Sequence, residues 1–427
     1  MMHEVILSRS EELSFDLVTM LNYSNLKRID RRLSIQNNVN TRLHSSTNSQ
    51  TRSILILGVD EVPNSFLSTC FANFKLMKIM DCEGAPIDYI PKEVGNLLHL
   101  KYLNLRDTKV QMLPKSIGKL QNLETLDLKR SLVSELPTKI GRLRKLRYLV
   151  AYIENTKTKV SIDAVQAVKI HSGIGCLQSL QKLFKIEANN TSLIEELGGL
   201  GQLRKLEISK MKRENGMALC TALEKMSHLQ SLRIRTTSEE EVLELQSMSS
   251  PPPLLQALSL PGWLEKFPEW ILKLNSIPRI DLNWLKLMED SLKVLQALPN
   301  LMSLWLHDGY GGEQLHIGRG GFQKLKSLGS YYLGVLNRLI IDECALPLLE
   351  YLEIGECPQL KEVPSGIHHL KSLKVCNFGI CQLNSFLVCY QMKALILEKS
   401  SIFPLSLSSI GLMDKTTKAT SLVIRNC

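Results

Sequence analysis

The sequence predicts an α/β solenoid, with short parallel strands on the inner side of each turn and irregular or helical returns on the outer side. Three observations support this prediction. Leucine accounts for 77 of the 427 residues, about 18%, although the hydrophobic share is an ordinary 44%. A leucine pattern recurs at a fixed step of 23 residues. Each copy ends in apolar residues two positions apart, as in a strand with one buried face.

The repeat is clearest between residues 97 and 151. Three segments align there, namely Leu97-x-x-Leu100-x-x-Leu103-x-Leu105, Leu120-x-x-Leu123-x-x-Leu126-x-Leu128 and Leu143-x-x-Leu146-x-x-Leu149-x-Ala151. One step earlier, the same positions hold Phe74, Met77, Met80 and Cys82. No such unit can bury its leucines alone, so its stability depends on neighbouring units. The pattern therefore predicts a leucine-rich-repeat fold, a curved horseshoe with a parallel inner sheet.

Each regular repeat closes with the pattern Leu-Pro-x-x-Ile-Gly, as in Leu113–Gly118. Proline has no N–H to leave unpaired in a return segment. Glycine tolerates backbone angles that other residues avoid. We therefore expect Pro114 to shape the outer side of the repeat, and Gly118 to adopt an unusual backbone angle there.

Looser copies of the pattern extend in both directions, to roughly 14 repeats. Earlier strands are expected at Leu33–Ile35 and Ile54–Ile56. After Phe378 the pattern weakens, and Leu395–Leu397 and Leu422–Ile424 could be terminal strands. Three stretches break the step and are expected to be loops that leave the solenoid, namely Tyr152–Gly175, Ser238–Pro253 and Gly309–Gly321.

Composition and motifs exclude several classes of protein. The apolar content is too high for a disordered chain. The ten cysteines include no Cys-x-x-Cys pair, which favours free, buried thiols in a reducing cytoplasm over disulfides or a metal site. No apolar run is long enough to span a membrane, and Val5–Leu7 is too short for a signal peptide. Phosphate-binding loops and hydrolase motifs are missing, so we expect no catalytic residues and no cofactor.

Side chains that flank the strand leucines are expected on the concave surface, because neighbouring residues in a strand point to opposite faces. Aromatic residues and arginine are enriched among residues that dominate protein interfaces. The candidate protein-binding residues are Tyr102, Arg106, Lys129, Tyr148, Tyr152, Arg233, Arg235, Trp305, His307 and Tyr351. Trp305 is the most conspicuous of them. Its indole is either exposed for binding or packed on neighbouring strands.

The net charge of +10 is concentrated in one block. Residues Lys92–Lys159 contain 15 Lys and Arg against 6 Asp and Glu, a net charge of +9 that leaves +1 for the rest of the chain. Such a block favours an acidic protein partner or a solvated outer surface, and nucleic acid is the less favoured ligand. Four of its cations are expected on the outer side of the repeats, namely Lys115, Lys119, Lys139 and Arg142.

Several segments carry features beyond the repeat. They are Val5–Glu12, Arg31–Ile35, Met77–Gly84, Pro251–Gln256 with Leu264–Trp270, Gly320–Lys324 and Cys357–Lys361. Together they resemble the coiled-coil class of plant nucleotide-binding leucine-rich-repeat (NLR) disease-resistance proteins, over about residues 1–378. The resemblance implies three parts: residues 1–25 as a remnant of the winged-helix end of a nucleotide-binding switch domain, 26–378 as the repeat domain, and 379–427 as weak terminal repeats or a tail.

The resemblance also implies a function. Such a module is a non-enzymatic part of plant innate immunity that senses a pathogen effector or a guarded host protein and restrains the nucleotide-binding switch. The expected partner is thus an effector, a host protein or the switch domain. A switch domain is not recognisable in this sequence, so the chain would be either a fragment or a partner that acts in trans. We do not expect His3 to act as the nucleotide sensor of the family.

Two other hypotheses remain. The chain could be a general signalling scaffold that binds kinases or small GTPases, since the Leu-Pro-x-x-Ile-Gly unit is shared with such proteins. It could also be a substrate adaptor for ubiquitin ligation, although no docking domain for a ligase is recognisable near its N-terminus. The sequence predicts neither the identity of the ligand nor the oligomeric state.

Overall fold

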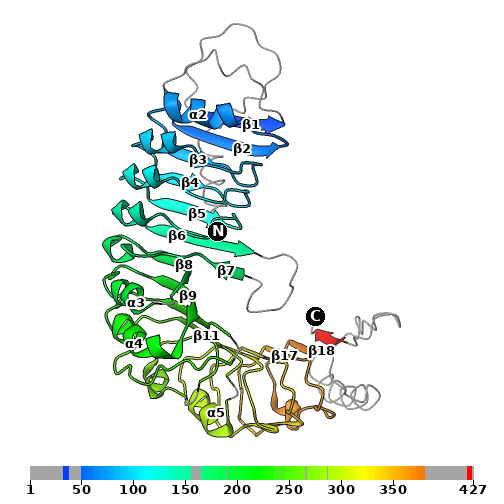
Figure 1. Ribbon diagram of the computed structural model, residues 1–427. Helices are drawn as coiled ribbons and strands as arrows, with labels where there is room; N and C mark the ends of the chain where they lie inside the picture. The colour runs from blue at the N-terminus through cyan, green and yellow to red at the C-terminus, as the bar shows by residue number, and fades with distance from the viewer. Residues whose placement is uncertain are drawn as a thin grey trace. The chain divides into compact units, whose positions relative to one another are not determined.

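The computed structural model of the protein describes residues 32–37, 50–154, 165–188, 190–238, 240–264, 267–285, 287–379 and 421–425. Contacts between residues divide the chain into two compact units, the first ending at Ser209 and the second beginning at Lys210. Each unit is a stack of repeats, and each repeat contributes a short strand to a parallel sheet (Figure 1). Residues 1–25 and Leu395–Leu397, for which sequence predictions were made, lie outside the described residues.

The first unit contains β1 (Arg32–Asn37), β2 (Ser53–Val59), β3 (Ile79–Asp81), β4 (Tyr102–Asn104), β5 (Thr125–Lys129), β6 (Tyr148–Glu154), β7 (Val165–Ala167) and β8 (Lys182–Glu187), and β9 (Lys205–Met211) runs past its end. The strands expected at Leu33–Ile35 and Ile54–Ile56 are therefore confirmed. Its helices are α2 (Asn64–Asn73) and α3 (Thr191–Leu197), with 3₁₀ turns η2 (Lys92–Asn96), η3 (Lys115–Lys119), η4 (Thr138–Arg142) and η6 (Ile174–Cys176).

The core of the first unit is a row of in-register side chains. Met80 pairs with Leu103, Leu103 with Leu126, Leu126 with Leu149, and Leu149 with Leu183 across adjacent parallel strands. All five are fully buried. The 23-residue step predicted this row from Met80 to Leu149, including the methionine that replaces a leucine, but not Leu183, which follows Leu149 by 34 residues. Full burial of each such side chain typically contributes about 1.5–3 kcal/mol.

The proline–glycine return of each repeat forms a 3₁₀ turn, as in η2, η3 and η4, which begin directly after Pro91, Pro114 and Pro137. The expected role of the glycine was wrong. Gly118 is not among the residues with a positive φ angle. A Cβ atom there would instead lie 2.7 Å from the Lys139 carbonyl oxygen of the next turn. Glycine is needed because successive turns approach closely.

The second unit contains β10 (Ser231–Thr236), β11 (Ala257–Pro261), β12 (Arg279–Asn283), β13 (Ser303–His307), β14 (Gln314–Ile317), β15 (Ser327–Tyr331), β16 (Arg338–Ile341), β17 (Tyr351–Gly355), β18 (Val375–Gly379) and β19 (Ser421–Arg425). Its helical segments are η7 (Arg213–Asn215), α4 (Gly216–Glu224), η8 (Glu269–Lys273), α5 (Glu289–Gln296) and η9 (Ile367–His369). The main sheet runs in parallel from β10 through β11, β12, β13, β15 and β17 to β18. The terminal strand β19 pairs with β18 in antiparallel fashion.

Parts of all three interruptions are described by the structure, which leaves out residues 155–164 and 239. In the first, Tyr152–Gly175, strand β7 pairs antiparallel with the end of β6. In the second, Ser238–Pro253, Leu243 and Leu245 are buried, and the Leu245 carbonyl accepts a hydrogen bond of 2.8 Å from Trp270 Nε1. In the third, Gly309–Gly321, strand β14 pairs in parallel with β16 in a separate sheet. Leu243 and Leu245 in the second interruption, and Leu315 and Ile317 in the third, are buried in the unit, so the prediction of departing loops was wrong for these two. The middle of the first interruption lies outside the described residues, so its prediction stays untested.

The prediction that the cysteines are buried holds for five of the seven in the described residues. Cys176 and Cys344 are exposed, which corrects it. Burial raises the pKa of the Cys70 thiol to about 12, so this thiol stays protonated.

No helix in the described ranges combines the length and apolar character that crossing a membrane requires.

We predict that Gly118→Ala lowers the free energy of unfolding by about 1–3 kcal/mol, because the added methyl group overpacks the contact with the Lys139 carbonyl. Urea unfolding followed by circular dichroism measures the loss. Gly201→Ala is the matched control, since a Cβ atom at Gly201 meets nothing within 4 Å. Equal stability of the two variants would contradict the close-approach explanation.

Candidate functional site

The strand face of the second unit carries rows of outward side chains, set by the register of the sheet. The middle row runs from Arg233 through Ser259, Asp281, Trp305 and Gly329 to Glu353. A second row places Asn283 beside His307 and His307 beside Tyr331. The register therefore gathers charged and aromatic groups from β10, β12, β13, β15 and β17.

Trp305 is half-buried, because its ring lies across the neighbouring strand. Gly329 is its direct partner in β15, and a Cβ atom at Gly329 would overlap the indole ring. The Trp305 Nε1 atom donates a hydrogen bond of 3.0 Å to Ser303 Oγ within its own strand. The structure thus supports the alternative in which the ring packs on a neighbouring strand, while part of its surface stays open.

Three rings form a nearly parallel group beside Gly329. The centroids of His307 and Tyr331 are 4.9 Å apart with planes 9° from parallel. The centroids of Trp305 and Tyr331 are 6.2 Å apart with planes 10° from parallel. Offset stacking of this kind contributes about 0.5–1.5 kcal/mol per pair. It also holds the rings in fixed orientations, which lowers the entropy lost when a ligand packs against them.

An open depression of about 360 Å³ adjoins the aromatic group. Its lining residues are Arg233, Arg279, Asp281, Asn283, Trp305 and His307. An Arg233 guanidinium nitrogen lies 3.8 Å from the Asp281 carboxylate. Burial raises the pKa of Asp281, although the nearby Arg233 and Arg279 oppose this effect. Burial also lowers the pKa of His307, which favours a neutral imidazole.

Five of the ten predicted residues lie in the second unit. The structure brings Arg233, Trp305 and His307 together at the depression. Arg235 lies two residues further along β10, so it belongs to the same face. Tyr351 is 47% exposed and lies in β17, two strands from Trp305, where it is available but separate from the aromatic group.

The other five predicted residues lie in the first unit. Tyr102 and Tyr148 are half-buried, and both pair with Thr125 in register. Lys129 is also half-buried. Arg106 lies just beyond β4, where its Nε atom is 3.5 Å from Glu83. These four residues are partly accessible on the strand face.

Tyr152 does not fit the prediction of an accessible residue, because only 7% of its surface is exposed. A bulge in β8 gives Lys185 a φ angle of 62°, and its Nζ atom lies 4.3 Å from the centre of the Tyr152 ring. The same ammonium group is 3.9 Å from Glu207 Oε1. Tyr152 is thus covered by a cation and by the Phe184 ring, whose centre is 6.1 Å away.

Part of the basic block lies on the outer turns. Lys115 and Lys119 belong to η3, Lys139 and Arg142 belong to η4, and all four are exposed, as expected. Lys101 is different, because it forms an ion pair of 2.7 Å with Glu124. Lys157 and Lys159 fall outside the described residues. The outer turns therefore present a positive surface that differs in chemistry from the aromatic strand face.

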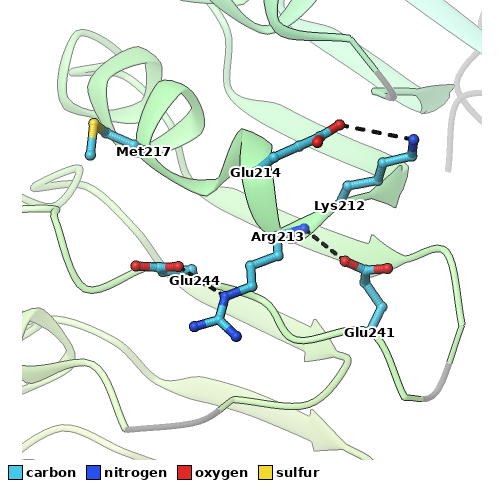
Figure 2. Close-up of a pocket in the computed structure, with 6 residues that line it drawn as sticks. All are labelled: Lys212, Arg213, Glu214, Met217, Glu241 and Glu244. Carbon is cyan, nitrogen blue, oxygen red and sulfur yellow. Dashed lines mark hydrogen bonds and ion pairs between the residues drawn. The ribbon is translucent and has the colours of Figure 1, made fainter.

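A second depression, of about 450 Å³, lies beside α4 (Figure 2). It is lined by Lys212, Arg213, Glu214, Met217, Glu241 and Glu244. The Arg213 backbone N–H donates a hydrogen bond of 2.8 Å to Glu241, and its Nε atom donates one of 3.3 Å to Glu244. These contacts connect residues 241–244 to the segment just before α4. Because the charged groups pair with one another, this depression is a weaker candidate for ligand binding than the one beside Trp305.

Four residues of the aromatic depression and its surroundings were not among the predicted residues. Arg279, Asp281 and Asn283 flank the leucine pattern Ile277-x-x-Ile280-x-Leu282, where their positions could have been counted. Tyr331 belongs to a repeat that was overlooked, because Ser330 replaces its last apolar residue and is itself buried. The interval of 48 residues between Leu301 and Leu349, twice the local step, was the available signal.

Within the described ranges, no three His, Cys, Asp or Glu side chains gather in a way that could hold a metal ion. The depression beside Trp305 offers two arginines, a carboxylate and an imidazole on a parallel sheet. Such an arrangement suits binding through ion pairs and ring stacking.

Comparison with known proteins defines the class. The family model of the leucine-rich repeat region matches residues 50–398, and the chain belongs to this family. A solved leucine-rich-repeat protein of Leptospira interrogans shares the fold, with a TM-score of 0.54, 20% identity, and coverage of 82% of this chain and 89% of that one. The strand-face depression described above is thus part of a leucine-rich-repeat solenoid.

Among known relatives, the chain is similar to plant disease resistance proteins. It is 31% identical to disease resistance protein RPM1 of Arabidopsis thaliana over 229 residues, which are 54% of this chain and 24% of RPM1. It is 29% identical to disease resistance protein Pik-2 of Oryza sativa subsp. japonica over 211 residues, which cover 43% of this chain and 21% of Pik-2. The matched part thus spans about a quarter of these relatives or less.

We predict that Trp305→Ala lowers the free energy of unfolding by about 1–2 kcal/mol, because the indole is only half-buried against Gly329 and Tyr331. Leu126→Asp should cost several kcal/mol more, because Leu126 is fully buried and a carboxylate there has no partner. Thermal and urea unfolding measure both losses. Equal losses would contradict the assignment of Trp305 to the outward face.

We also predict that His307 contributes to a loss of stability as the pH falls through about 6.5, the ordinary pKa of histidine. Burial lowers its pKa in the folded state, so the unfolded chain binds the proton first. Urea unfolding at pH 7.5 and 5.5 should therefore show a smaller pH effect for His307→Gln than for the wild type. The raised pKa of Asp281 has the opposite effect on stability, but this effect is the same in the wild type and in His307→Gln. An equal pH effect in the two proteins would count against the burial of His307.

Proposed function

We propose that this chain is a non-enzymatic protein-recognition module of plant innate immunity that acts in the cytoplasm. The proposal is that it senses a pathogen effector or a guarded host protein. Its support is the match to plant disease resistance proteins, combined with a leucine-rich-repeat fold.

The aromatic depression of the second unit is the observation that carries the proposal. A parallel sheet holds Arg233, Trp305 and His307 at one depression, and their partners fix the side-chain orientations. Arginine and tryptophan are the side chains whose loss most often costs a protein interface its affinity. A rigid platform of this kind can bind a partner without a large ordering penalty.

The positive outer turns support a second element of the proposal, restraint of a nucleotide-binding switch domain. Lys115, Lys119, Lys139 and Arg142 lie on two successive turns with a common orientation. An acidic surface of a switch domain would be attracted to such a cluster, and the attraction would weaken with salt. Recognition would then use the strand face, and restraint would use the outer turns.

The alternative is a general signalling scaffold that binds kinases or small GTPases. The shared Leu-Pro-x-x-Ile-Gly turns fit both hypotheses, whereas the relatives with disease resistance names favour the first. The identity of the proteins that bind the strand face distinguishes the two.

We predict that proximity labelling in leaf cells, during challenge with a pathogen, recovers effectors, defence-related host proteins or resistance-protein domains. Trp305→Ala should reduce the recovery of the main partner about ten-fold, since a hot-spot residue contributes more than about 1.4 kcal/mol. Val335→Ala is the control, because Val335 is 50% exposed and lies outside the strands of the main sheet. Recovery of kinases or small GTPases without resistance proteins would favour the scaffold.

A further inference from the structure

Charge is distributed unevenly along the strand face of the second unit. Arg233 and Arg235 lie in β10, and Arg279 begins β12, so three cations occupy one side of the face. The rings of Trp305, His307 and Tyr331 follow in β13 and β15. The face therefore passes from a cationic part to an aromatic part over adjacent strands.

Arg279 differs from Arg233 in its partners. Arg233 is 3.8 Å from the Asp281 carboxylate. Arg279 is exposed, and its guanidinium group makes no hydrogen bond or ion pair with the residues that the structure describes. One carboxylate thus faces two guanidinium groups in the same depression. The depression has an excess positive charge and a planar donor group that is not engaged.

We propose that this depression binds an acidic peptide segment of the protein partner, in which a carboxylate side chain lies close to an aromatic ring. The carboxylate pairs with Arg279, and the aromatic ring packs against Trp305. This inference rests on the proposed recognition function and names the chemistry of the segment that is recognised. Guanidinium and carboxylate groups form paired hydrogen bonds, which supply direction as well as attraction.

The spacing of the strands sets the spacing within the peptide. Arg279 and Trp305 lie in β12 and β13, which are direct neighbours in the sheet. Arg279 pairs with Ser303 and Asp281 pairs with Trp305, so Arg279 and Trp305 are diagonal neighbours about 7–8 Å apart. An extended chain advances about 3.4 Å per residue. A peptide that crosses the strands thus presents its carboxylate and its ring about two or three residues apart.

The same groups favour a peptide over a nucleic acid. Aromatic rings and arginines also suit single-stranded nucleic acids, whose bases stack and whose phosphates attract cations. Here, however, the Asp281 carboxylate lies 3.8 Å from Arg233 in the same strand as Arg279, and Glu353 lies in the same outward row as Trp305. Two carboxylates along the path would repel successive phosphates, whereas a peptide needs to place only one negative charge.

Fluorescence anisotropy with the full chain tests the proposal. The probes are labelled ten-residue peptides with the central sequence Asp-Glu-Ala-Trp, Lys-Lys-Ala-Trp or Asp-Glu-Ala-Ala, flanked by Gly and Ser, together with a labelled oligouridylate. We expect the first peptide to bind about ten-fold tighter than each of the other probes. Its affinity should fall when salt rises from about 0.05 M to about 0.3 M, because the ion pair is solvent-exposed.

Variants of matched charge test the residues. Arg279→Glu should weaken the binding of the first peptide about ten-fold or more. Arg338→Glu should leave it unchanged, because Arg338 is exposed in β16, outside the main sheet. Trp305→Phe, which retains a ring over Gly329, should weaken it less than Trp305→Ala. Unfolding curves for every variant separate lost binding from lost folding.

Each contrary result is informative. Equal binding of the three peptides, no effect of Arg279→Glu, or no binding at all would overturn the proposed peptide class. Tighter binding of the oligouridylate, lost in Arg279→Glu, would overturn it in favour of a nucleic acid. If the lysine peptide binds best and depends on Trp305, the class is wrong while recognition at this face stands. Failure of the recognition function itself would appear as proximity labelling that Trp305→Ala does not change.

Discussion

The stacking of each repeat on the next, at the distance of hydrogen-bonded parallel strands, is the interaction on which the rest of the structure depends. It buries Leu103, Leu126 and Leu149 in one continuous row, although none of these repeats encloses a core of its own. The same distance brings successive outer turns so close that Gly118 has no room for a side chain. Leucine inside and glycine outside are therefore two consequences of one spacing.

This spacing also determines the chemistry of the surface. Parallel strands in register place equivalent side chains beside one another, so the outward residues form rows across the sheet. In the second unit such a row joins Asp281, Trp305 and Glu353, which are far apart in the sequence. In the first unit the corresponding row joins Asp81 and Asn104, whose side chains form a buried hydrogen bond of 2.9 Å. Identical backbone geometry thus yields a binding platform in one place and an internal polar contact in another.

Much of the fold could be predicted from the sequence, because leucine, proline and glycine recur every 23 residues in the regular repeats, where the packing of successive repeats requires all three. The prediction failed where packing is satisfied by other means. Ser330 replaces an apolar residue, so its repeat and Tyr331 were overlooked, and apolar residues within two of the interruptions pack where loops were expected. The candidate site was harder to predict. The alternation of a strand placed Trp305 on the outward face, but the bulge at Lys185 that covers Tyr152 has no signal in a single repeat.

The contact between Trp305 and Gly329 makes two neighbouring repeats depend on each other, so they keep this contact only if they are inherited together. The indole occupies its position only because the next strand lacks a side chain there, so replacing either repeat alone would displace the ring. Repeat arrays commonly diversify when whole units are duplicated, deleted or exchanged. A recombination event between β13 and β15 would separate the Trp305 ring from Gly329. An exchange that moves both strands together would keep the contact. Selection on recognition at this face would thus act on pairs of repeats.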